Sequence, residues 1–173
     1  MKTAATIKLE KLLCQSMDSR NDFFVFECTI GWLGKEIVDC IKYTVQREIY
    51  CYEIKQSKQD FYSKNALTFI GNYNYFVMPY ALYEQVKADI PKGIGVYVSI
   101  SEIETVVKET KYGTEYSPKY TSGFNQLICI QKAKRQELKA DKEVILSSML
   151  RSMQRDRLWN YKELQNERTR KAD

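Results

Sequence analysis

Hydrophobic residues recur along the chain with two different periods, and each period predicts a type of secondary structure. Leu9, Leu12, Leu13 and Met17 fall on one face at helical spacing, which predicts a helix over residues 6–17. Short alternating or apolar runs predict strands over residues 23–29, 36–44, 48–56, 74–78, 95–99 and 127–130. Further helices are predicted over residues 58–67, 80–89 and 133–167, the last because it contains neither glycine nor proline.

The order of these elements predicts an α/β fold, with a mixed central sheet flanked by helices and a long helix at the C-terminal end. Residues 101–124 are harder to assign, since they carry turn signals at Tyr112-Gly113 and at Ser117-Pro118. A chain of 173 residues suits one domain with its own core. We therefore predict a domain over residues 1–130, followed by a basic helical extension over residues 131–173.

The composition is that of an ordinary globular protein, with 44% hydrophobic and 28% charged residues. No apolar run approaches the ~18–20 residues that a membrane span needs. Lys8, Glu10 and Lys11 interrupt the region where a signal peptide would have its apolar core. The five cysteines are odd in number and form no C-x-x-C pair, which favours buried thiols in a reducing compartment. We expect an intracellular, cytoplasmic protein with no membrane partner.

The chain contains no histidine, and this absence excludes several kinds of chemistry. A Ser-His-Asp triad, a Cys-His pair and a zinc site with histidine ligands are all impossible. An enzyme built from this sequence must work with carboxylates, lysine, tyrosine, hydroxyls or thiols. A metal site would use oxygen ligands, which favours Mg²⁺ or Mn²⁺.

The net charge of +5 is distributed unevenly. Basic and acidic side chains balance over residues 1–130, so the whole excess lies in residues 131–173. A basic helix is typical of proteins that bind a polyanion, but a solvated charged surface explains the same pattern. Both interpretations stay open at this point.

Two neighbouring predicted strands each place a carboxylate on a face that is otherwise apolar. Alternation puts Asp39 on the face of Ile37 and Ile41, and it puts Glu53 and Lys55 on the face of Cys51. A carboxylate on a buried face destabilises a fold by several kcal/mol unless a cation or hydrogen bonds compensate it. The two carboxylates therefore indicate a shared cation or a salt-bridged sheet.

The spacing of the two strands predicts that these carboxylates face each other. If residues 45–47 form a three-residue loop, Thr44 pairs with Glu48 and Asp39 lies opposite Glu53. Cross-strand Cβ atoms are then about 4.5–5.5 Å apart, which suits two ligands of one divalent ion. The backbone carbonyl of Ile54 is a third candidate ligand. Lys55 is placed to stabilise negative charge on a phosphate or on an activated water.

Asp39 followed by Glu53-Ile54-Lys55, on consecutive strands after a helix, resembles the core of the PD-(D/E)XK phosphodiesterase superfamily. The stretch from Tyr52 to Phe61, the run Asn74-Tyr75-Phe76-Val77-Met78-Pro79 and the segment Pro91 to Tyr97 are similar to its MmcB-like, DNA-repair-associated branch. Val38 replaces the proline of the superfamily name, and the tryptophan that often follows the lysine is absent. The resemblance covers roughly residues 5–135.

The resemblance implies a restriction-endonuclease-like fold and a nuclease that cleaves DNA with Mg²⁺ or Mn²⁺, in repair, restriction or phage processing. RNA stays open as a substrate. Asp39, Glu53 and Lys55 would be the catalytic residues, and Asp39, Glu53 and the Ile54 carbonyl would bind the metal. Glu10 corresponds to the helix-borne glutamate of some members, as a further ligand. Candidate substrate contacts are Ser57, Lys58, Lys64, Lys134 and Arg135.

Structural or non-catalytic roles explain some of the same residues. Ser57 has the type and position of a helix N-cap, with Asp60 three residues later. The protein could keep the nuclease fold and bind nucleic acid without turnover. It could also be an assembly protein that forms homo-oligomers through its C-terminal helix, whose apolar residues equally suit packing on its own domain.

Overall fold

The computed structural model describes residues 2–18, 20–31, 36–63, 69–111 and 113–170. Its centre is one six-stranded sheet in the order β1-β2-β3-β4-β5-β6. The β3/β4 and β4/β5 pairs are parallel, and the other three pairs are antiparallel. The strands are β1 (Asp22–Thr29), β2 (Ile37–Thr44), β3 (Ile49–Ile54), β4 (Tyr73–Pro79), β5 (Gly95–Thr110) and β6 (Gly113–Gln131). The predicted mixed α/β sheet is confirmed.

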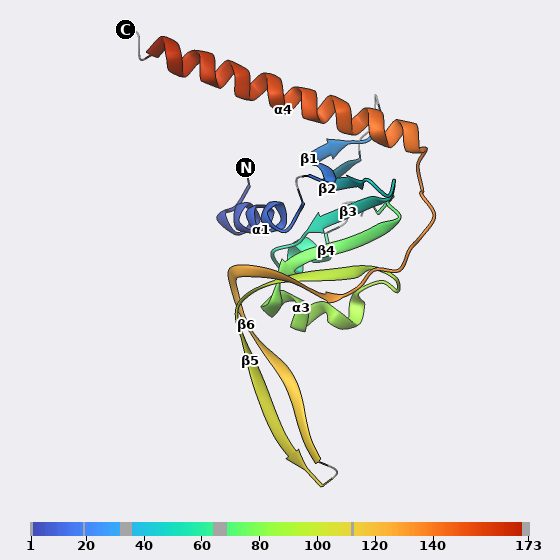
Figure 1. The fold of residues 1–173 in the computed structure, drawn as a ribbon, viewed down its shortest axis with the longest axis vertical. Coiled ribbons are helices and arrows are strands. Elements are labelled where there is room, and N and C mark those ends of the chain that lie inside the picture. Colours follow the sequence, from blue (N-terminus) through green and yellow to red (C-terminus); the bar gives the residue numbers. More distant parts are fainter. Residues whose placement is uncertain (1, 19, 32–35, 64–68, 112, 171–173) are drawn as a thin grey trace.

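Helices lie on both faces of this sheet (Figure 1). They are α1 (Ala4–Gln15), the single turn α2 (Lys58–Phe61), α3 (Tyr80–Val86), a short 3₁₀ helix (Lys87–Asp89) and α4 (Lys142–Arg170). The helix predicted over residues 58–67 ends at Phe61, and residues 64–68 lie outside the described part of the chain. In the part of the chain that the structure describes, no helix is long and apolar enough to cross a membrane.

The alternation along β3 decides which helix each of its side chains meets. Tyr52 and Ile54 are buried with Leu9 and Leu13 of α1. Ile49 and Cys51 point to the other face, where Ile145 and Met149 of α4 complete the core with Val25, Val38 and Ile41. The first turns of α4 therefore share a core with the sheet, while the predicted division of the chain at residue 130 stays a prediction.

The pair β5/β6 is much longer than predicted. Its strands have 16 and 19 residues, and it projects from the sheet as a two-stranded arm (Figure 1). The turn predicted at Ser117-Pro118 is wrong, because Pro118 pairs with Thr105 within the arm. A proline is tolerated there because β6 is an edge strand, whose outward N–H groups need no partner. The hairpin closes with Thr110 opposite Gly113, as the other turn signal indicated.

The last helix begins at Lys142, nine residues later than predicted. Residues 132–141 instead run extended along the end of the sheet. Their backbone N–H groups donate to carbonyls of the loops before β4 and β5, in the pairs Lys134–Gly93 (2.9 Å), Gln136–Asn72 (2.8 Å) and Lys139–Ile70 (3.2 Å). Asp141 then caps α4, since its Oδ1 accepts the N–H groups of Glu143 and Val144. These long-range bonds outweigh the local helix propensity of the segment.

Candidate active site

The β2–β3 hairpin has the register that a three-residue loop predicted. Ile41 pairs with Cys51 and Cys40 pairs with Tyr52, so the ladder extrapolates to Asp39 opposite Glu53. The loop has three residues and contains no glycine. Arg47 takes the left-handed position with φ of 63°, and its N–H donates to the Thr44 carbonyl at 2.9 Å.

At the end of this ladder, a side-chain oxygen of Asp39 takes the place of a β2 backbone carbonyl as hydrogen-bond acceptor for β3. The backbone N–H of Ile54 donates to Asp39 Oδ2 at 2.8 Å. Because N–H and C=O of one residue face the same neighbouring strand, the Ile54 carbonyl also faces β2. Burial raises the pKa of Asp39, although the bond from Ile54 and the charge of Lys55 act in the opposite direction. The carboxylate is thus held in place while its charge is poorly solvated.

Glu53 and Lys55 are both buried, each with 5% of its surface exposed. Glu53 lies in register with Phe76 of β4, and the N–H of Lys55 donates to the Val77 carbonyl at 2.9 Å. The Lys55 ammonium lies 3.9 Å from Asp60 Oδ1. Two parallel strands and the start of α2 therefore fix the lysine in the cavity that Asp39 and Glu53 also line.

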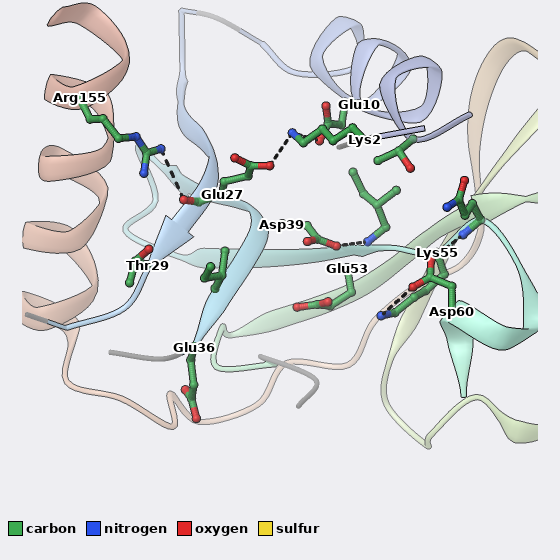
Figure 2. Close-up of a pocket in the computed structure, with 14 residues that line it drawn as sticks. Lys2, Glu10, Glu27, Thr29, Glu36, Asp39, Glu53, Lys55, Asp60 and Arg155 are labelled. Atoms are coloured by element: carbon green, nitrogen blue, oxygen red, sulfur yellow. Dashed lines mark hydrogen bonds and ion pairs between the residues drawn. The ribbon is translucent and has the colours of Figure 1, made fainter. Parts of the chain in front are cut away.

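These residues line one cavity of about 760 Å³ between α1, α4 and the strand ends (Figure 2). Its charged lining among the described residues comprises six carboxylates and three basic groups. The carboxylates are Glu10, Glu27, Glu36, Asp39, Glu53 and Asp60, and the basic residues are Lys2, Lys55 and Arg155. The formal charge of this lining is negative, which disfavours an anionic ligand unless a cation is also bound.

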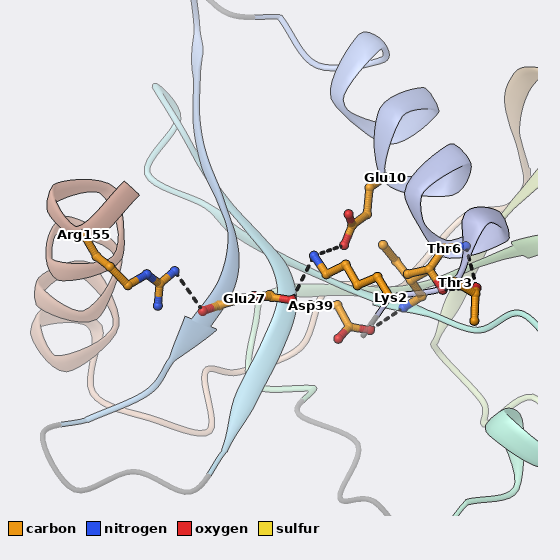
Figure 3. A network of polar contacts seen from close by, with 8 residues as sticks. Lys2, Thr3, Thr6, Glu10, Glu27, Asp39 and Arg155 are labelled. Carbon is orange, nitrogen blue, oxygen red and sulfur yellow. Dashed lines mark hydrogen bonds and ion pairs between the residues drawn. The ribbon is translucent and has the colours of Figure 1, made fainter. Parts of the chain in front are cut away.

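A network of polar contacts joins residues of α1, β1 and α4 that line the cavity (Figure 3). The Lys2 ammonium lies 2.6 Å from Glu10 Oε1 and 2.8 Å from Glu27 Oε1. From the other side, Arg155 of α4 donates to the Glu27 carbonyl at 3.5 Å. Glu27 has a left-handed φ of 51°, which interrupts the otherwise regular β1–β2 pairing at the position facing Asp39.

Comparison with known proteins supports the fold of this chain. No protein-family model and no curated protein matches the sequence. The fold has a solved counterpart. It is similar to the SPO1766 protein of unknown function from Silicibacter pomeroyi, with a TM-score of 0.65 and 13% sequence identity, over 95% of this chain and 96% of that chain. At this identity the likeness shows a shared fold alone.

Several predicted substrate contacts lie apart from the cavity. Arg135 pairs with Glu48 at 3.0 Å, at the beginning of β3, whereas the cavity lies at the other end of that strand. Lys134 neighbours it on the same extended segment. Ser57 and Lys58 are exposed and do not line the cavity; Ser57 Oγ accepts the N–H of Asp60 at 3.2 Å, as an N-cap does. Lys64 lies outside the described residues.

Lys2, Glu27 and Arg155 also line the cavity, and they were not among the site residues predicted from the sequence. For Glu27 a signal was present, since it is the one charged side chain inside the apolar run Phe23-Phe24-Val25-Phe26-Glu27-Cys28. That is the same kind of interruption that singled out Asp39. Arg155 carried no local signal, because its approach to the cavity depends on where α4 begins and how it packs.

The oxygen donors at the end of the hairpin fit a divalent metal of the magnesium type. Among the described residues, no group of three or more His, Cys, Asp or Glu side chains is arranged as a complete metal site. Mg²⁺ commonly takes one or two carboxylates and keeps several waters. Asp39, the buried Glu53 and the Ile54 carbonyl would supply such a partial set, whereas Glu10 is already paired with Lys2.

Proposed function

We propose that the protein is a nuclease that hydrolyses DNA phosphodiester bonds with Mg²⁺ or Mn²⁺, on a restriction-endonuclease-like sheet. One observation carries the proposal. Asp39, Glu53 and Lys55 come from adjacent strands, line the same cavity and are held there by backbone contacts of the sheet. The combination of two carboxylates with a buried lysine suits a reaction that needs both a cation and a stabilised anion.

In this proposal each residue has a separate role. Asp39, Glu53 and the Ile54 carbonyl hold the divalent ion, whose chemistry is activation of water and neutralisation of phosphoryl charge. Lys55 directs its ammonium group toward negative charge that develops on the phosphate, in a buried place where such an interaction is strong. Arg155 is a phosphate contact at the other wall of the cavity, because a guanidinium binds phosphate oxygens in a planar, forked geometry.

The net charge of the cavity supports a role for metal in substrate binding as well as in chemistry. Six carboxylates against three basic groups, among the lining residues that the structure describes, would repel a nucleic acid strand. A bound divalent ion neutralises part of the negative charge of the lining. DNA binding should therefore strengthen when Ca²⁺, a divalent ion that oxygen ligands bind, is added to protein freed of metal.

The decisive experiment compares two lysines close together in the sequence. Purified protein with Mn²⁺ should cleave some form of DNA, and Lys55→Ala should lower the rate at least ~100-fold, the order expected for a lost electrostatic contact in the transition state. Lys58→Ala is the comparison variant, since Lys58 is exposed on α2 and outside the cavity lining: an equal loss of rate there would assign the effect to substrate contact by basic residues and not to the buried lysine. Cleavage that persists unchanged in the Lys55→Ala protein would contradict the mechanism.

A second candidate function, assembly through the C-terminal helix, rests on exposed apolar residues of α4. Leu150, Leu158, Trp159 and Tyr161 each have more than half of their surface exposed. Leu150, Leu158 and Tyr161 lie within about 80° of one another around the helix axis, and an exposed apolar face of this kind is typical of a helix that packs on a partner. Light scattering over a range of protein concentrations tests this candidate, because a monomer at every concentration would exclude homo-oligomers.

Metal-dependent DNA binding without cleavage would instead favour a protein that keeps the nuclease fold and binds nucleic acid without turnover.

A further inference from the structure

The position of Lys2 is the feature of the cavity that the proposed function leaves unexplained. Its ammonium group bridges two carboxylates from different elements, Glu10 of α1 and Glu27 of β1. Both contacts, at 2.6 and 2.8 Å, have the length of charge-assisted hydrogen bonds. Burial opposes the charge on Lys2, but hydrogen bonds to Glu10 and Glu27 outweigh it and raise the pKa of the ammonium group. Lys2 therefore remains a cation in the lining of an acidic cavity.

Lys2 can leave this position without disturbing the fold. It directly precedes Thr3, the N-cap of α1, whose Oγ1 accepts the N–H of Thr6 at 3.2 Å and also contacts the side chain of Gln56. The backbone is thus tied down next to Lys2, while its side chain has four rotatable carbon–carbon bonds. A rotation of that side chain alone would release Glu10 and Glu27.

We infer that Lys2 is an internal counter-cation that competes with the divalent metal ion for the acidic cavity, so that metal loading displaces the Lys2 ammonium from Glu10 and Glu27. The inference rests on the proposed function, because it assumes a metal at Asp39 and Glu53. Like charges in a poorly solvated cavity repel strongly, so the ammonium and the metal disfavour each other. Lys2 thereby lowers metal affinity and keeps the metal-free cavity closer to neutral.

The test measures Mn²⁺ affinity of the full chain by calorimetry and by the electron paramagnetic resonance signal of free Mn²⁺. Lys2→Met should bind Mn²⁺ about tenfold tighter than the wild type, the order expected for removing one nearby charge. Lys2→Arg keeps the charge and should restore wild-type affinity within about twofold. Lys8→Met is the matched control: it removes one positive charge from α1, the helix that follows Lys2, but Lys8 lies over the Phe124 ring and outside the cavity lining.

The outcomes separate this inference from the proposed function. Equal Mn²⁺ affinity in wild type and Lys2→Met overturns the inference and leaves the nuclease proposal standing. An equal gain in Lys8→Met also overturns it, because the effect would then be one of net charge. If none of the proteins binds Mn²⁺ at millimolar concentration, the metal site itself is wrong and both proposals fail. Binding by Lys2→Met alone supports the inference in its strongest form.

A second measurement follows the lysine itself. In protein labelled with ¹³C in its lysine side chains, titration with Mg²⁺ should move the Cε signal of Lys2 toward the position of a solvent-exposed lysine. The signal of Lys8 should stay in place. A Lys2 signal that is unchanged at saturating Mg²⁺ would show that the ammonium keeps its carboxylate partners, which contradicts displacement.

Discussion

The backbone N–H of Ile54 donates a 2.8 Å hydrogen bond to Asp39 Oδ2, and this bond ties the first carboxylate of the site to the strand that carries the other two groups. Glu53 and Lys55 flank Ile54 directly. Any shift between β2 and β3 would therefore separate Asp39 from its proposed partners. The bond also leaves the carboxylate with lone pairs for a metal, because each oxygen can accept more than one contact.

The first prediction concerns the stability of Asp39→Asn. Burial raises the pKa of Asp39, which means that the folded state disfavours its charged form. An asparagine oxygen can still accept the N–H of Ile54. We expect Asp39→Asn to unfold at a higher temperature than the wild type in EDTA at pH 7, by roughly 2–4 °C for each 1 kcal/mol gained at this chain length. The same variant should lose Mn²⁺ binding.

Asp18→Asn is the control of opposite sign. Hydrogen bonds from the Arg20 backbone and the Asn21 side chain lower the pKa of the exposed Asp18, so the folded state favours its charge. Its replacement should leave the unfolding temperature unchanged or slightly lower. If Asp39→Asn also unfolds at a lower temperature than the wild type, the folded state does not disfavour the charged form of Asp39 as proposed.

The second prediction is a pH dependence that follows from the same shift. A carboxyl group whose pKa is raised on folding stabilises the fold most below the pKa of an ordinary aspartate, and this contribution is lost as pH rises through the raised value. The gap in unfolding temperature between Asp39→Asn and wild type should therefore be small at pH 4 and widen toward pH 7. Calorimetry in EDTA across this range checks it, and a gap independent of pH would contradict the assignment.

Strand alternation and loop length could predict the central part of this site, because both are local properties. The pairing of Ile41 with Cys51 follows from a three-residue loop, and Arg47 supplies the left-handed conformation that a glycine usually takes. Asp39 and Glu53 then stand out because each is a charged residue on a strand face that is otherwise apolar. No knowledge of the rest of the fold was needed for this step.

The far wall of the cavity could not be predicted, because it depends on contacts distant in sequence. Residues 132–141 have the composition of a helix, yet their N–H groups find partners at Gly93, Asn72 and Ile70. Those bonds decide where α4 begins, and hence that Arg155 approaches Glu27. The same limit applies to the long β5/β6 arm, since nothing local marks how far two strands stay paired.

The third prediction separates a structural role of Ser57 from a role in substrate binding. Ser57 Oγ accepts the N–H of Asp60, and Asp60 Oδ2 accepts the N–H of Gln56 at 3.1 Å. Loss of such an N-cap lowers the free energy of unfolding by about 0.5–2 kcal/mol. We expect Ser57→Ala to unfold more easily in urea while its DNA affinity stays within about twofold of wild type. A large loss of affinity with normal stability would restore the substrate-contact interpretation.

The fourth prediction uses two arginines on α4 that lie two residues apart. Arg155 lines the cavity with Asp39 and Lys55, whereas Arg157 lines a separate apolar groove with Phe24 and Met153. If Arg155 contacts a phosphate, Arg155→Ala should weaken DNA binding in Ca²⁺ about tenfold and reduce the slope of affinity against salt by about 1. Arg157→Ala removes the same charge from the same helix and should change neither. Fluorescence anisotropy over a salt series distinguishes the two, because equal effects would indicate a general attraction between DNA and the basic helix.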